Sequence, residues 1–210
     1  MPINTAVIYG SVRRDRQGIK AARFLVKKLQ ALGHDVSLVD AKEYPLPILD
    51  LRYSEYDEGS APEAMQKIHE MLDAADGFIV VSGEYNHGIP SGLKNLLDHF
   101  LPQYKRKPSA IVSYSAGSFA GARVHASLRE VLSTLGSVPV PPALLISSIS
   151  KSFDEDGNAL DQAYEERADI AYGMGTAAYQ LGEYSKARRS LGVNMFSVPA
   201  AALRCAAVRT

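Results

Sequence analysis

Short apolar runs alternate along this chain with longer stretches in which apolar residues recur every three or four positions. The short runs are rich in β-branched residues, which is typical of buried strands. They cover residues 5–9, 36–40, 78–81, 108–114 and 143–146. The longer stretches predict helices that bury one side, and they begin near residues 19, 61, 91, 124 and 160, the last reaching residue 181. Strands that alternate with helices predict a parallel sheet with helices on both faces.

This alternation favours an α/β fold of the flavodoxin-like kind, a doubly wound, five-stranded parallel sheet in the order 2-1-3-4-5. The order reverses direction between strands 1 and 3. The loops after strands 1, 3 and 4 are therefore predicted to converge on one crevice beyond the carboxyl ends of the strands. With 210 residues, the chain suits a single domain. We assign residues 1–184 to that domain and residues 185–210 to a C-terminal tail without an assigned role.

Composition argues against several classes of protein. Lys plus Arg and Asp plus Glu both number 23, so the formal net charge is zero and nothing favours nucleic acid as a partner. Cys205 is the single cysteine and cannot form an internal disulfide. The start of the sequence lacks a signal segment, and no apolar run approaches the roughly 18 residues of a membrane-spanning helix. These features predict a cytoplasmic protein with no membrane partner.

The loop after the first predicted strand carries residues suited to a phosphate. Between Gly10 and Gly18 it places small and cationic residues where a helix begins. Free backbone N–H groups, the positive end of the helix, the Ser11 hydroxyl and Arg13 can converge there on an anion. The loop is not a dinucleotide fingerprint, because the next glycine after Gly10 is Gly18, and no Gly-Lys-Ser/Thr follows as in a Walker sequence. A solvated basic turn explains this loop equally well.

Two further loops follow the third and fourth predicted strands. The first is polar, contains one aromatic residue, Tyr85, and is flanked by Gly83 and Gly88, which let the backbone turn tightly and approach a ligand. The second covers residues 115–121 and is rich in small residues. Small residues allow main-chain N–H groups to come close to a ligand. Both loops therefore suit the close approach of a ligand.

Three motifs in these loops carry a family resemblance. They are Gly10-Ser11-Val12-Arg13, Glu84-Tyr85-Asn86-His87-Gly88-Ile89-Pro90-Ser91-Gly92-Leu93-Lys94-Asn95 with Asp98, and Ser115-Ala116-Gly117 through Gly121. Together they resemble the signature of the NADPH-dependent FMN reductases, the family that includes quinone, azo-dye and chromate reductases. The resemblance covers residues 4–182 in the same order. Two positions depart from the family pattern: Gly83 stands where the family commonly has Pro, and Gln17 where it often has Ser.

The resemblance implies a flavodoxin-like fold, FMN as cofactor, and reduction of a small-molecule electron acceptor by NADPH or NADH. The acceptor is a quinone, an azo compound, a metal oxyanion or free flavin, and no catalytic side chain is assigned because the flavin carries the chemistry. Family members are often homodimers or homotetramers that share the flavin site. The implied cofactor-binding residues are Ser11, Arg13 and Gln17 at the phosphate, Gly83, Glu84, Tyr85, Asn86 and His87 along the isoalloxazine ring, and Ser115, Ala116 and Gly117 on its other side.

Some roles stay open in the sequence. The basic residues Arg13, Arg14 and Arg16 can serve the FMN phosphate, the 2′-phosphate of NADPH or neither, so NADPH is not selected over NADH. Glu84 and His87 can act in proton transfer, but a solvated loop side chain is the simpler interpretation. Gly83 is expected to loosen its loop and to weaken the affinity for flavin.

Other functional classes fit less well. Ser115 half matches a nucleophile elbow, but an α/β-hydrolase needs a carboxylate and then a histidine after its serine, and His125 follows with no carboxylate between. A flavodoxin-like electron carrier that serves a protein partner is the alternative, although such carriers tend to be acidic and this chain is neutral. The histidines share no metal-ligand spacing, so no metal is predicted.

Overall fold

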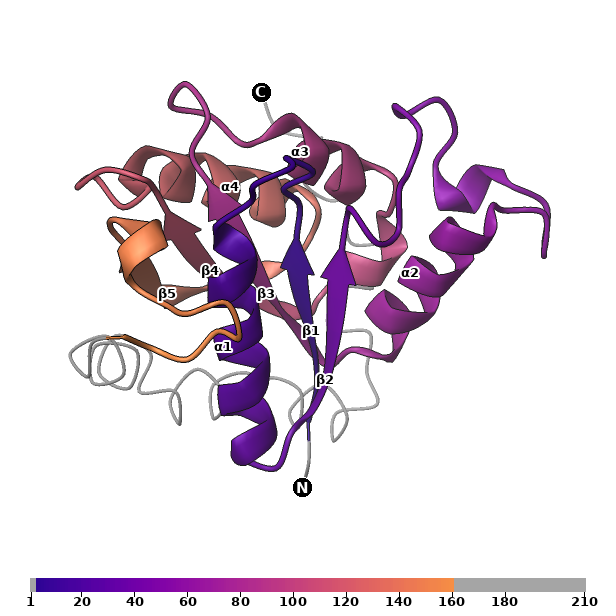
Figure 1. Ribbon diagram of the computed structural model, residues 1–210. Coiled ribbons are helices and arrows are strands. Elements are labelled where there is room, and N and C mark those ends of the chain that lie inside the picture. The colour runs from indigo at the N-terminus through magenta and orange to yellow at the C-terminus, as the bar shows by residue number, and fades with distance from the viewer. Residues whose placement is uncertain (1–2, 161–210) are drawn as a thin grey trace, which may run out of the picture.

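The structure is a computed structural model that describes residues 3–160, without the side chains of residues 141 and 142. Strands and helices alternate over this range as predicted (Figure 1). The predicted helix at 160–181 and the tail at 185–210 lie outside the described residues, apart from Leu160. The strands are β1 (Asn4–Tyr9), β2 (Asp35–Asp40), β3 (Gly77–Gly83), β4 (Pro108–Tyr114) and β5 (Val138–Ile146), and the α-helices are α1 (Gly18–Ala31), α2 (Glu63–Ala74), α3 (Ser91–Asp98) and α4 (Ala122–Thr134).

The five strands form one parallel sheet in the order β2-β1-β3-β4-β5. Tyr9, at the carboxyl end of β1, lies beside Asp40 of β2 and Val81 of β3. Gly83, at the end of β3, lies beside Tyr114 of β4. The predicted flavodoxin-like order is therefore confirmed. It brings the loops after β1, β3 and β4 to the same edge of the sheet, at the top of Figure 1.

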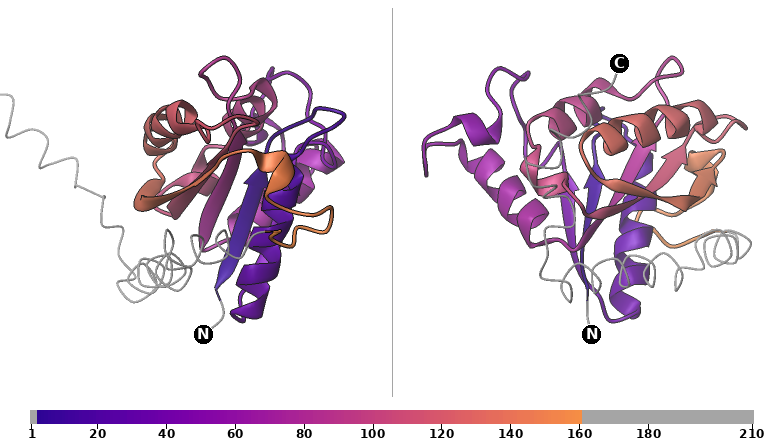
Figure 2. Two further views of the ribbon diagram at one scale, coloured as in Figure 1. Left: turned by 60° about the vertical axis from the view of Figure 1, so that its left-hand side comes forward. Right: turned by 180° about the vertical axis from the view of Figure 1, so that it is seen from behind.

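Helices cover both faces of the sheet. Side chains alternate along each strand, so Val7 and Tyr9 of β1 pack with α1, whereas Ala6 and Ile8 pack on the opposite side. Among the described helices, α1 covers the first face, and α2, α3 and α4 cover the second (Figure 2). Burial on both faces explains why the strands appear in the sequence as continuous apolar runs.

Helices α1 and α4 both end at a glycine in the left-handed conformation. Gly33 has a φ of 81° and donates its N–H to the Gln30 carbonyl at 2.9 Å, while the His34 N–H reaches the Leu29 carbonyl at 3.1 Å. Gly136 follows α4 with a φ of 83°. Residues that carry a Cβ adopt this conformation only with strain. The two glycines therefore stop both helices close to the predicted ends.

Strand β5 is longer than its apolar run predicts. It begins at Val138 rather than at residue 143, and it includes Pro139, which lies beside Ser109 of β4. Among the strands of residues 3–160, β5 is the last in the sheet, so one side of its backbone pairs with none of them, and proline is tolerated there. Within residues 3–160, no helix is long and apolar enough to cross a membrane.

Candidate functional site

The loops after β1 and β3 are in direct contact at the carboxyl edge of the sheet. A Cβ on Gly10, in the first loop, would stand 2.2 Å from the Leu93 Cα in α3. A Cβ on Gly92 would stand 2.6 Å from the Gly10 carbonyl oxygen. Neither position has room for a side chain, so the two glycines allow the first loop to touch the start of α3. The predicted convergence of these loops is confirmed.

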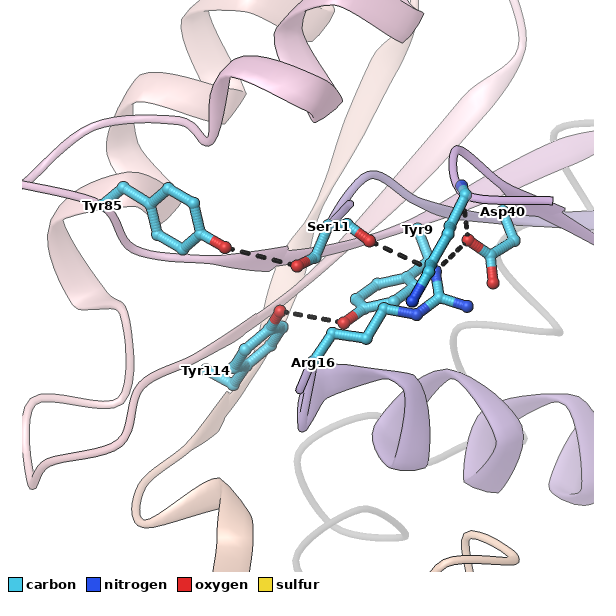
Figure 3. A network of polar contacts seen from close by, with 7 residues as sticks. Tyr9, Ser11, Arg16, Asp40, Tyr85 and Tyr114 are labelled. Carbon is cyan, nitrogen blue, oxygen red and sulfur yellow. Dashed lines mark hydrogen bonds and ion pairs between the residues drawn. The ribbon is translucent and has the colours of Figure 1, made fainter. Parts of the chain in front are cut away.

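The first loop brings Ser11 and Arg13 to Tyr85 of the second loop. Ser11 is buried, and its hydroxyl lies 3.3 Å from the Tyr85 hydroxyl (Figure 3). Arg13 is exposed, and its guanidinium carbon lies 5.9 Å from the centre of the Tyr85 ring, which is within cation–π range. Ser11 and Tyr85 are 74 positions apart in the chain. The structure thus brings Ser11 and Arg13, which the family resemblance assigns to the phosphate, next to Tyr85, which the resemblance assigns to the ring.

The start of helix α1 has no side-chain cap and no acidic residue. Gln17 occupies the N-cap position, but its side chain makes no capping hydrogen bond, and the first turn carries no acidic residue. The backbone N–H groups of a first helical turn lack partners within the helix and carry partial positive charge. Ser11, Arg13 and Gln17 therefore belong to a loop whose helix start suits a phosphate.

Arg16, to which the sequence gives no definite role, turns inward. Its guanidinium donates to the carboxylate of Asp40 at the end of β2 and, at 3.2 Å, to the Ser11 carbonyl (Figure 3). Its guanidinium carbon lies 5.4 Å from the centre of the Tyr9 ring. The Asp40 side chain is fully buried. In the sequence Asp40 looks only like the polar last residue of a strand, so no local signal indicates this pair.

The Tyr114 ring fills the space between the start of α1 and the end of β3. A Cβ on Gly18 would stand 2.1 Å from this ring, and a Cβ on Gly83 would stand 3.0 Å from it. Gly83 is buried and lies beside Tyr114 in the sheet. The structure therefore differs from the expectation that Gly83 loosens its loop, because the position belongs to a closely packed strand end.

The phenol groups of Tyr9 and Tyr114 lie close to Ser11. The Tyr114 hydroxyl donates to the Tyr9 hydroxyl at 3.4 Å (Figure 3). Burial raises the pKa of Tyr114, and the neighbouring Tyr9 raises it further. Burial also raises the pKa of Tyr9, against the opposing effect of hydrogen bonds to Tyr114 and Ser11. Both phenols stay protonated at neutral pH and act as hydrogen-bonding groups rather than as bases.

Asn86 and His87 form the tip of a tight turn. Tyr85 and Gly88 exchange backbone hydrogen bonds of 3.1 and 2.9 Å, and the φ angles of Asn86 and His87 are 49° and 66°. Positive φ at both central residues defines a type I′ turn. Both side chains at the tip are exposed. They stand at the outer edge of the loop, where a ligand can reach them.

Glu84 caps helix α4 from the neighbouring loop. Its carboxylate accepts the backbone N–H groups of Arg123 at 3.0 Å and of Val124 at 3.2 Å, and it pairs with the Arg123 guanidinium at 3.2 Å. Burial disfavours the charge of Glu84, but these hydrogen bonds and the Arg123 cation outweigh it, so the pKa of Glu84 lies below its ordinary value. Glu84 is ionised at neutral pH, which makes it a poor proton donor. Its carboxylate ties the second loop to α4.

The third loop is anchored beside β5. The Ser115 N–H donates to the Ile146 carbonyl at 3.1 Å, and the Ser148 N–H donates to the Gly117 carbonyl at 3.0 Å. The Ser115 hydroxyl donates to the Gly117 carbonyl at 2.9 Å, whereas a catalytic nucleophile contacts a base. Ala116 and Gly117 are exposed, and a Cβ on Gly117 would meet nothing within 4 Å. A flat ligand has room beside this loop.

These features fit a cofactor with a phosphate at one end and a flat ring at the other. The uncapped helix start with Ser11 and Arg13 suits the phosphate, and the free space at Gly117 suits the ring.

Two cavities, of about 200 Å³ and 260 Å³, lie elsewhere in the described part of the chain and are lined by none of the predicted site residues. The part of the chain that the structure describes places no group of three or more His, Cys, Asp or Glu side chains for a metal ion.

Most of this chain is similar in sequence to one protein family and to known proteins. Residues 3–151 match the family described as NADPH-dependent FMN reductase. An NAD(P)H-dependent FMN reductase of Pseudomonas aeruginosa is 34% identical over 139 residues, which cover 64% of this chain and 72% of that protein. A quinone reductase of Escherichia coli is 29% identical over 166 residues, which cover 76% of this chain and 86% of that protein.

A solved structure shows the same fold. The flavoenzyme FerB of Paracoccus denitrificans, an NAD(P)H:acceptor oxidoreductase, matches with a TM-score of 0.63 at 22% sequence identity, covering 88% of this chain and 96% of that chain. At this identity the likeness supports the architecture alone. The sequence match from residue 3 to residue 151, by contrast, includes all three loops of the candidate site. The chain therefore belongs to the NADPH-dependent FMN reductase family, a family of oxidoreductases.

Proposed function

We propose that this enzyme holds FMN across the three converging loops, takes hydride from NADPH or NADH, and reduces a small quinone. The observation that carries the proposal is the uncapped start of α1, with Ser11 and Arg13 in the preceding loop and Tyr85 in contact with both. A phosphate satisfies the free N–H groups of such a helix start, and arginine adds a charge-assisted contact.

Each loop has its own part in holding the cofactor. Ser11, Arg13 and Gln17 bind the phosphate, the backbone of residues 83–87 follows one edge of the isoalloxazine ring, and residues 115–117 close the other side. FMN, when bound, accepts hydride at its N5 and passes it to the acceptor. Main-chain N–H groups of the small residues stabilise the negative charge of the reduced ring. The support for these roles is the family resemblance of the three motifs and the free space at Gly117.

A quinone is the acceptor that the observations favour. The quinone reductase of Escherichia coli matches this chain over 86% of its own length. Aromatic surface is available in two of the loops, at Tyr85 and at Phe119, which is 66% exposed with the Arg123 guanidinium carbon 4.7 Å from its ring centre. Flat aromatic molecules stack on such side chains. An azo compound, a metal oxyanion and free flavin are the competing acceptors.

The purified protein tests cofactor, donor and acceptor in turn. After incubation with FMN and removal of the excess, we expect one noncovalent FMN per chain, identified by mass spectrometry of the released ligand. Anaerobic NADPH or NADH should then bleach its absorption band. Release of FAD, or no bound flavin after reconstitution, would refute the cofactor assignment. Turnover with a benzoquinone should exceed turnover with an azo dye, chromate and free FMN, and a lower rate would refute the choice of acceptor.

A flavodoxin-like electron carrier for a protein partner is the alternative function. A carrier receives its electrons from a separate reductase, so NADPH or NADH alone would leave its flavin oxidised. The formal net charge of zero weighs against this function, because docking of such carriers commonly relies on a strongly charged surface. Bleaching of the bound flavin by NADPH or NADH alone identifies the enzyme.

A further inference from the structure

The pair formed by Arg16 and Asp40 links the predicted phosphate loop, which contains Arg16, to the end of β2, and it has no part in the function proposed above. The Asp40 side chain is 0% exposed and that of Arg16 is 13% exposed. One Asp40 oxygen accepts hydrogen bonds from the Arg16 guanidinium and, at 2.9 Å, from the Lys42 N–H. A buried carboxylate is strongly unfavourable without such partners. The end of β2 therefore holds Arg16 in one place.

Arg16 in turn holds the backbone of the loop. Its guanidinium donates to the Ser11 carbonyl at 3.2 Å and lies over the Tyr9 ring, as Figure 3 shows. The Ser11 backbone is thereby linked to β2 as well as to β1. On the other side of Ser11, Gly10 has no free space against Leu93. The segment that carries the Ser11 hydroxyl is thus restrained from two directions by the protein alone.

We propose that Arg16, anchored by Asp40, is a positioning residue that sets the conformation of the loop for the FMN phosphate. This inference rests on the function proposed above. Asp40 neutralises the charge of Arg16, whereas Arg13 and Arg14 are exposed in the same loop. Arg16 acts through the Ser11 backbone, and Arg13 supplies the cation that meets the phosphate. A loop that is already ordered loses little freedom on binding, which raises affinity.

A direct contact between Arg16 and the phosphate would respond differently to one substitution. Asp40→Asn removes a negative charge near the loop and keeps the size of the side chain. If Arg16 bound the phosphate itself, this change would free its charge and would preserve or strengthen FMN binding. If Arg16 positions the loop, loss of the anchor weakens FMN binding even though the change in charge favours an anion. The sign of the change in affinity separates the two roles.

Affinities for FMN and for riboflavin, measured by quenching of flavin fluorescence with the full chain, test the proposal. Riboflavin lacks the phosphate and reports on the ring site alone. We expect Asp40→Asn to weaken FMN binding about tenfold and to leave riboflavin affinity within about twofold of the parent. Arg16→Lys should act in the same direction, because the lysine side chain is one bond shorter and its ammonium does not reach the position from which the Arg16 Nη1 donates to both Asp40 and Ser11.

Matched controls and the thermal unfolding of the flavin-free proteins complete the test. Asp15→Asn matches Asp40→Asn, and Arg14→Lys matches Arg16→Lys, but both controls change exposed side chains of the same loop. Each control should alter FMN affinity by less than about twofold. A purely structural pair would lower the melting temperature without changing the ratio of FMN to riboflavin affinity, and that result overturns the proposal. So does FMN affinity of Asp40→Asn at or above that of the parent.

Two failures have separate meanings: a variant that does not fold, and a parent chain that does not bind FMN. If Asp40→Asn does not fold, Arg16→Lys decides by the same affinity ratio: a selective loss for FMN supports the positioning role, and an unchanged ratio overturns it. Failure of the unmodified chain to bind FMN would instead overturn the proposed function, so the two failures are distinguishable.

Discussion

Arg13 and Arg16 belong to one loop and have opposite surroundings. Arg13 is exposed beside Tyr85, whereas Arg16 is paired with the buried carboxylate of Asp40. A cation that is exposed near a helix start is available to a ligand, but a cation that is neutralised inside the protein is not. The neighbours of each arginine, rather than its residue type, indicate which one is available to a ligand.

Arg13→Ala should weaken FMN binding by about tenfold to a hundredfold, because a charge-assisted contact contributes roughly 1.5–3 kcal/mol. Fluorescence titration with FMN measures the change. The stability of the flavin-free protein should barely change, since Arg13 is exposed. At saturating FMN most of the activity should return, because hydride transfer occurs at the ring. Arg14→Ala is the control, and equal FMN affinity in Arg13→Ala and the parent would exclude the phosphate role.

Gly18 is a position where helix propensity and packing predict opposite effects. In a helix interior alanine is favoured over glycine by about 1 kcal/mol, and Gly18 is the first residue of α1, so propensity alone predicts a smaller stabilising effect of Gly18→Ala. A Cβ at this position would stand 2.1 Å from the Tyr114 ring. Overpacking of this kind costs about 1–3 kcal/mol. We expect Gly18→Ala to lower the free energy of unfolding, measured by urea denaturation.

The variant Tyr114→Leu provides the control for this prediction. Its shorter side chain leaves room for a Cβ, so Gly18→Ala should be less destabilising in that background, which a double-mutant cycle measures. Gly83→Ala should show the same coupling in weaker form, because its Cβ would stand 3.0 Å from the ring. Equal effects of Gly18→Ala in the two backgrounds would mean that Tyr114 is not the obstacle.

Among the secondary-structure elements, two helices that begin at the carboxyl edge of the sheet have different N-termini. The Glu84 carboxylate caps α4 from another loop, whereas α1 begins without a side-chain cap or an acidic residue in its first turn. Unpaired N–H groups at a helix start attract an anion. The N-terminus of α4 is already occupied by a carboxylate, so of these two helices α1 offers the better site for a phosphate.

Glu84→Gln should lower the free energy of unfolding at neutral pH by about 1 kcal/mol, because the amide keeps the size of the cap but loses its charge. The pKa of Glu84 in the folded protein lies below its ordinary value. Its contribution is therefore complete above the ordinary glutamate pKa and is lost as the pH falls through the lower folded value.

Denaturant unfolding of the parent and of Glu84→Gln over a pH series measures this contribution. The difference in stability between the two proteins should be constant near neutral pH and should shrink below about pH 4. A difference that stays the same from neutral pH into the acid range would show that the charge of Glu84 does not stabilise α4.

For the molecule as a whole, apolar side chains are exposed in two loops of the candidate site. Val12, in the first loop, is 53% exposed, and Phe119, in the third loop, is 66% exposed. Exposed apolar surface around a site often contacts a ligand or another subunit. We expect a homodimer or homotetramer with the flavin site near a subunit boundary.

Light scattering at micromolar concentration should give at least twice the mass of one chain. Val12→Asp should shift the protein toward the monomer, because a charge is unfavourable in an apolar interface. Ile48→Asp is the matched control, since Ile48 is 89% exposed but lies in the connection between β2 and α2. A monomeric parent, or the same shift in both variants, would contradict the expected interface.

Local patterns were sufficient for much of the fold. The apolar run at residues 78–81 and the glycines after α1 and α4 indicate a strand and two helix ends without knowledge of the remaining structure. The start of β5 was less predictable, because Val138 and Pro139 join the strand through pairing with β4. Pairing of this kind depends on a distant segment, and the residues at the start of β5 resemble a loop when they are considered alone.

The type and order of the elements and the family follow from periodicity and short motifs, which are properties of neighbouring residues. The partners of individual side chains follow from the folded chain. Arg16 meets Asp40 across 24 positions, and Glu84 meets Arg123 across 39. Both contacts exist because parallel strands bring loops from distant parts of the chain to one edge of the sheet. The physical reason is that a side chain's charge and burial depend on what packs against it, and local sequence does not specify that packing.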